Sequence, residues 1–287
     1  MFFLENGMSR FDICEIYLCI ELQKNTHYFL RTSVFLVSLY NFKPLIYFNR
    51  NIILNLFIMA IKESLKAAIY PLYEELAKVD QDQSYTSFCV QWGEKYQPGG
   101  MLFVGRATYG WAVDDRDTER LFTDGCESQI FARPDQMKWV EKENYWNRSA
   151  FWRVIKKVTQ GVIGQQPDWY EHIAWDNLYK LSPDGSNPSD ALCRKQENLC
   201  FEIFKQELSV LQPKVVILLT GKNWNYDFLC SVNGDEEPVV LEEKNWSKYK
   251  AVAYKIGDTV FVGTEHPQGK SEAEHVAILT ELVKKYI

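Results

Sequence analysis

The sequence predicts an α/β fold, a three-layer α/β/α sandwich with a mostly parallel central sheet. From about residue 100 onward, short runs rich in β-branched and aliphatic residues alternate with longer segments of helical periodicity. The short runs are bounded by glycine or proline, which is typical of buried parallel strands. Alternation of this kind predicts a parallel sheet with helices on both of its faces.

Residues 1–58 differ in composition from the rest of the chain. They contain no alanine and one glycine, and they are rich in Phe, Ile, Leu, Asn and Tyr. Their longest uncharged apolar runs are shorter than the roughly 20 residues that a membrane helix needs, and no signal-peptide pattern is present. We therefore expect either that translation begins at Met59 or that 1–58 is a poorly ordered or membrane-touching extension. In both cases 59–287 is expected to be a single domain.

The elements of that domain follow from periodicity and from capping residues. An amphipathic helix is predicted from Met59, and further helices are predicted after Ser149, Ser189 and Ser271. Pro213 is expected to end the second of these, and Ser271 and Glu274 have the spacing of a capping box. The predicted strands are 101–104, 172–181, 214–220 and 259–264.

The bulk properties exclude several classes of function. A net charge of −6 argues against a protein that coats nucleic acid electrostatically, although it leaves room for a local basic groove. Seven cysteines without a C-x-x-C pair indicate reduced thiols in a cytoplasmic protein. Metal-ligand spacing is absent as well. We therefore expect no metal, no cofactor and no membrane partner.

The segment 263–271, GTEHPQGKS, ends in Gly-Lys-Ser as a phosphate-binding P-loop does. A P-loop has four residues between its two glycines, whereas five separate Gly263 from Gly269. Pro267 lies between them and has no N–H to offer a phosphate. This corner is therefore expected to serve another purpose.

Ligands of parallel α/β sheets bind at the carboxyl ends of the strands. Four corners of the predicted sheet occupy such positions, at 105–109, 177–180, 221–222 and 265–267. They offer an amide with a donor and an acceptor, an imidazole, and an aromatic ring near a glycine. Such groups are able to read a flat heterocycle.

Three of these corners contain short sequence motifs. "FVGRATYGW" supplies Gly105, Ala107 and Tyr109, "IAWDNLYKLSPDGSNP" places Asn177 at a strand end, and "HPQGKS" supplies His266, Pro267 and Ser271. Lys180, Pro183 and Pro188 follow Asn177, and the strand-like segment "QPKVVILLTG" comes next. In this order the motifs resemble the uracil-DNA glycosylase superfamily over residues 100–287. The spacing of Lys180 and the two prolines, and the segment after them, resemble the branch of that superfamily that contains an iron–sulfur cluster.

The resemblance implies that a base is flipped out of DNA and hydrolysed from its sugar. Asn177 would bond O4 and N3–H of uracil, and His266 would donate to O2, where negative charge grows as the base leaves. Backbone N–H groups near Gly105 would assist, and Tyr109 would close the pocket against a 5-methyl group. Arg106 would complete the base pocket.

The sequence departs from the family pattern at three places. Arg106 and Ala107 stand where many members have a carboxylate, so Asp114 or Asp115 is left to orient water, with Asp114 the catalytic candidate beside His266. The family's leucine that inserts between stacked bases is replaced by Lys270. Lys270 and Ser271 are expected to contact DNA. The four cysteines of an iron–sulfur cluster are absent.

Other interpretations stay open for the same residues. Asn177 can be a turn former that bonds its own backbone, and His266 can be a structural histidine. For the whole chain, the alternatives are a catalytically degenerate relative that binds nucleic acid or a nucleotide, and an enzyme that acts on a free nucleoside.

Overall fold

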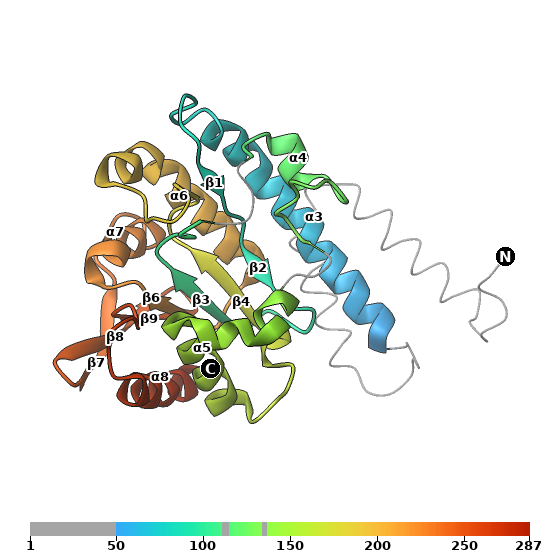
Figure 1. Cartoon of the computed structure of the whole chain (residues 1–287). Helices are drawn as coiled ribbons and strands as arrows, with labels where there is room; N and C mark the ends of the chain where they lie inside the picture. Colours follow the sequence, from blue (N-terminus) through green and yellow to red (C-terminus); the bar gives the residue numbers. More distant parts are fainter. Residues whose placement is uncertain (1–49, 111–114, 134–136) are drawn as a thin grey trace, which may run out of the picture. The chain divides into compact units, whose positions relative to one another are not determined.

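The computed structural model describes residues 50–110, 115–133 and 137–287 (Figure 1). Contacts divide the chain into two units, Met1–Ile53 and Leu54–Ile287, and the second carries the fold described below. Helix α3 runs through Met59 without a break. Among the described residues, no helix has the length and apolar character needed to cross a membrane.

A seven-stranded sheet forms the centre of this unit, in the order β2-β4-β3-β6-β9-β8-β7 (Figure 1). The four central strands β4, β3, β6 and β9 run parallel, whereas β2, β8 and β7 are antiparallel to their neighbours. The prediction of an α/β fold with parallel strands is thus confirmed, and the sheet is mixed, with a parallel centre and antiparallel edges. The strands are β2 Gln91–Trp92, β3 Met101–Gly105, β4 Ile173–Asn177, β6 Val215–Leu219, β7 Val239–Trp246, β8 Tyr249–Ile256 and β9 Thr259–Thr264, and the short strands β1 Thr86–Ser87 and β5 Leu181–Ser182 pair separately.

Helices connect these strands and pack on the sheet. They are α3 Arg50–Leu76, α4 Thr118–Phe122, α5 Ala150–Ile163, α6 Asp190–Leu211, α7 Lys222–Val232 and α8 Glu272–Tyr286, with short 3₁₀ helices η3 Lys138–Val140, η4 Lys142–Arg148 and η5 Trp169–His172. The predicted helices after Ser149 and Ser189 are confirmed as α5 and α6. The β7–β8 hairpin was not predicted.

Alternating side chains of the central strands enter two separate apolar clusters, as the two-residue period of a strand requires. Leu102 and Val104 of β3 pack in the cluster that contains α3, α6 and α7. Met101 and Phe103 pack in the cluster that contains α5 and α8. The sheet is therefore covered by helices on both faces (Figure 1).

The caps and strand ends refine the predicted boundaries. Ser189 caps α6 by accepting from the N–H of Leu192 at 3.2 Å. Ser149 and Ser271 occupy the N-cap positions of α5 and α8, but neither side chain makes a capping hydrogen bond. The predicted capping box of Ser271 and Glu274 is therefore wrong. The predicted strand 172–181 is shorter, because β4 ends at Asn177 and the chain then turns.

Candidate functional site

The carboxyl ends of the four parallel strands lie level with one another. Asn177 at the end of β4 pairs in register with Gly105 at the end of β3, and Leu219 of β6 pairs with Thr264 of β9. Strands β3 and β6 are neighbours in the sheet. From β3 the chain continues to β4, on one side of this pair, and from β6 it continues towards β9, on the other side. Such a reversal opens a crevice between the two strands, where ligands of α/β proteins bind. The candidate site lies at this reversal.

The side chain of Asn177 is held against the backbone of Gly105. A Cβ atom at Gly105 would collide with Oδ1 of Asn177 and would lie 3.3 Å from the ring of Phe151. Asn177 is 2% exposed, and its buried Nδ2 has no hydrogen-bond partner among the described residues. A buried polar group without a partner is unusual. The Asn177 amide is therefore the polar group of this corner that most needs an explanation.

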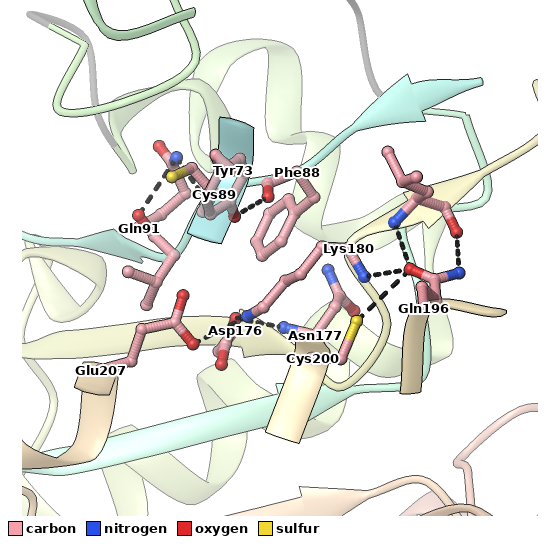
Figure 2. A network of polar contacts seen from close by, with 12 residues as sticks. Tyr73, Phe88, Cys89, Gln91, Asp176, Asn177, Lys180, Gln196, Cys200 and Glu207 are labelled. Atoms are coloured by element: carbon pink, nitrogen blue, oxygen red, sulfur yellow. Dashed lines mark hydrogen bonds and ion pairs between the residues drawn. The ribbon is translucent and has the colours of Figure 1, made fainter. Parts of the chain in front are cut away.

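A buried ionic triad lies beside Asn177 (Figure 2). The Asn177 backbone N–H donates to Oδ1 of Asp176 at 2.7 Å. The same oxygen accepts from Nζ of Lys180 at 2.5 Å, and that ammonium also contacts Oε2 of Glu207 at 2.8 Å. All three side chains of the triad are fully buried. The triad therefore ties β4 to helix α6.

Burial and the neighbouring charges shift the pKa values of Lys180 and Glu207 within the triad. Burial alone would lower the pKa of Lys180, but the carboxylates of Asp176 and Glu207 more than offset it, so the pKa is raised. Burial raises the pKa of Glu207 well above its usual range, and the negative charge of Asp176 adds to the effect. Both effects favour the neutral form of the Glu207 carboxyl group.

The turn that follows Asn177 is locked by one glutamine. Oε1 of Gln196 accepts from the backbone N–H groups of Lys180 and Leu181, at 3.2 and 2.9 Å. Its Nε2 donates to the carbonyl of Leu181 at 2.9 Å (Figure 2). The N–H of Leu178 also donates to the carbonyl of Gly105 at 3.0 Å. These bonds fix the end of β4 against the end of β3.

Arg106 bridges the ends of β3 and β6 at the reversal point. Its Nε donates to the carbonyl of Thr220 at 2.6 Å, and its guanidinium lies 5.1 Å from the ring centroid of Trp224. Burial lowers the pKa of Arg106, and the nearby carboxylate of Glu265 opposes that shift. The resemblance places a carboxylate at this corner, and the chain places a cation there instead.

His266 is held as a neutral imidazole with a defined tautomer. The backbone N–H of Gln268 donates to Nδ1 of His266 at 3.3 Å, so Nδ1 is the acceptor and Nε2 carries the proton. Burial lowers the pKa of His266 to about 4, and the positive charges of Arg106 and Lys270 contribute. His266 can therefore donate a hydrogen bond at neutral pH without carrying a charge.

Phe151 provides an aromatic wall beside His266. The two rings are stacked, with centroids 6.0 Å apart and an interplanar angle of 13°. The Phe151 ring also lies beside Gly105, next to the amide of Asn177. Three planar groups from β4, α5 and the loop after β9 thus gather around the end of β3.

The remaining predicted site residues lie around this group. Ala107 is partly buried against the cluster that contains α6 and α7, and Tyr109 is 64% exposed with a φ of 54°. Nζ of Lys270 lies 5.1 Å from the ring centroid of Tyr249. Ser271 is exposed just before α8, and Asp114 lies outside the described residues.

Several residues of the site were not singled out from the sequence as site residues. Phe151 belongs to the apolar face of α5, and periodicity alone does not separate it from core residues. Glu207 lies in α6, far along the chain from Asn177. Glu265 falls within the predicted corner at 265–267, but no role was assigned to it from the sequence.

Neither a family model nor a curated protein matches the chain. Within the described part of the chain, no group of three or more His, Cys, Asp or Glu side chains is arranged to hold a metal ion.

Proposed function

We propose that this chain is a divergent member of the uracil-DNA glycosylase superfamily, and that it flips uracil or a related damaged base out of DNA and hydrolyses it from the sugar. The observation that carries the proposal is the amide of Asn177, which is buried at a strand end with Nδ2 unpaired. An amide so placed presents one donor and one acceptor side by side. This pattern complements O4 and N3–H of uracil.

His266 supplies the second recognition group. When the glycosidic bond breaks, negative charge grows on O2 of the leaving uracil. A neutral imidazole that donates through Nε2 stabilises this charge without first binding a proton from solvent. Phe151, stacked beside His266, offers a face on which a flipped base can lie.

The fold and the cysteines support the same proposal. Helices pack on both faces of a sheet whose central strands are parallel, as expected of the three-layer α/β/α sandwich that we propose for 59–287. The cysteines of the described residues are free thiols, which fits the reducing cytoplasm. Under this proposal the partner is DNA that contains uracil or a damaged base.

Arg106 favours a second candidate function. A cation at the corner where the family places a carboxylate is suited to binding a nucleotide or nucleic acid without catalysis. An enzyme that acts on a free nucleoside is a third candidate. It would show no salt-dependent affinity for DNA, in contrast to the other two.

Base release distinguishes these candidates. The protein, with and without residues 1–58, is incubated with oligonucleotides that carry uracil, hypoxanthine or a mismatch, and abasic sites are revealed by alkaline cleavage. The proposal predicts cleavage that is lost in Asn177→Ala and His266→Ala. Salt-sensitive binding without cleavage would support the second candidate, and release from a free nucleoside alone would support the third.

A further inference from the structure

Hydrolysis of a glycosidic bond needs a group that orients the attacking water and accepts its proton. The corner at 105–109, after β3, carries Arg106 and Ala107 in place of the carboxylate that the resemblance places there. Two other carboxylates, one in β4 and one in the segment after β3, are already engaged. Asp176 is buried against Lys180, and Asp115 accepts from Ser128 at 2.6 Å.

Glu265 lies at the reversal point of the sheet and is only partly buried. A Cβ atom at Gly221 would lie 3.3 Å from Oε2 of Glu265 and 3.4 Å from Nη2 of Arg106. The carboxylate and the guanidinium therefore approach the same side of Gly221, in space that any other residue would fill. Since Arg106 is anchored to the carbonyl of Thr220, it holds a fixed positive charge near Glu265.

Glu265 is also adjacent in sequence to His266, the residue proposed to donate a hydrogen bond to the leaving base. It lies between Thr264, the last residue of β9, and His266. The N–H of Gly221 donates to the carbonyl of Thr264 at 2.8 Å, which ties the loop after β9 to the end of β6. The carboxylate and the imidazole are thus carried by one short, anchored segment.

We propose that Glu265 is the catalytic carboxylate of this site, in place of the one missing from the corner at 105–109. The inference rests on the proposed glycosylase function. The C1′–N bond breaks, and its electron pair leaves with the base, whose O2 accepts a hydrogen bond from Nε2 of His266. A water oxygen bonds to C1′, and the proton of that water passes to Glu265, which returns it to solvent. Arg106 is a positioning residue that acts through Glu265.

Single-turnover release of uracil from a uracil-containing oligonucleotide tests this role. Glu265→Gln keeps the shape of the side chain and removes the proton acceptor, so release should slow about 100-fold or more. Affinity for an oligonucleotide that carries 2′-fluoro-deoxyuridine, which resists cleavage, should stay within about twofold, because the lost interaction acts on the reaction step. The matched control is Asp184→Asn, an exposed carboxylate beside Gly110, which should leave the release rate unchanged.

Chemical rescue separates catalysis from support of the fold. Formate added to Glu265→Ala should restore part of the release rate, because it supplies a carboxylate to the space left by the side chain. A Glu265→Gln protein that releases uracil as fast as the wild type would overturn the role of Glu265 and leave the proposed function standing. Slow release without rescue, together with a lowered melting temperature, would overturn it in favour of a structural role. A wild-type protein that releases no base would overturn the proposed function, and the inference with it.

Discussion

At Gly105, the absence of one methyl group decides where the amide of Asn177 can lie. The backbone of Gly105 is not in a positive-φ conformation, so alanine is allowed there by the backbone and is opposed by the side chain of Asn177 and, less strongly, by the ring of Phe151. The glycine therefore serves the close approach of two strand ends and not a turn.

Gly105→Ala is accordingly predicted to displace the amide while keeping the fold. Base release should fall about 100-fold, since a shift of about 1 Å in a positioning group has a cost of this size. The measurement is single-turnover release, with circular dichroism as the control for folding. An alanine variant that retains the wild-type rate would show that the amide does not need this position.

The protonation of His266 gives a second prediction at the scale of single residues. Its ring nitrogens, followed by NMR, should titrate at about pH 4 and not at the ordinary value of 6.5, because burial disfavours the charged form. The folded protein then binds fewer protons than the unfolded chain between these values. The contribution to stability is present above pH 6.5 and is lost as the pH falls through about 4. Titration near 6.5 would contradict a buried, neutral imidazole.

At the scale of elements, strand β4 and helix α6 are joined by the buried triad. Lys180→Met removes the ammonium and leaves the carboxylate of Asp176 buried without its partner. The free energy of unfolding should fall by about 3–5 kcal/mol in urea denaturation. The matched control is Lys78→Met, which breaks the exposed pair with Glu75 and should change the stability little. Equal effects of the two substitutions would show that the triad does not support β4.

The elements differ in how well the sequence predicts them, for physical reasons. Helix α6 was predicted because its start carries the cap Ser189 and its end is followed by Pro213, both of which act locally. The β7–β8 hairpin was missed because the exposed pattern of β7 lacks the apolar run of a buried strand. Asn177 and His266 were singled out as candidates because Asn177 lies in a predicted strand at its carboxyl end and His266 lies two residues beyond another. Phe151 was not, because its place in the site depends on how α5 packs.

At the scale of the whole molecule, the site is assembled from segments far apart in sequence that meet at one edge of the sheet. The net charge of −6 opposes DNA, so binding needs local cations such as Lys270. The affinity for a uracil-containing oligonucleotide should fall about 10-fold between 50 and 200 mM salt. Lys270→Ala should reduce the slope of log K against log salt by about 1. An affinity independent of salt would favour the free-nucleoside alternative.

The proposed function depends on the amide of Asn177 reading a flipped base. This contact can be followed through the NMR signal of the Asn177 side-chain NH₂ group, identified by its loss in Asn177→Ala, during titration with a 2′-fluoro-deoxyuridine oligonucleotide. We expect a downfield shift as the unpaired Nδ2 finds an acceptor, and no such shift with the matching thymidine oligonucleotide. A signal that is unchanged at saturation with the uracil-containing strand would show that Asn177 does not read the base.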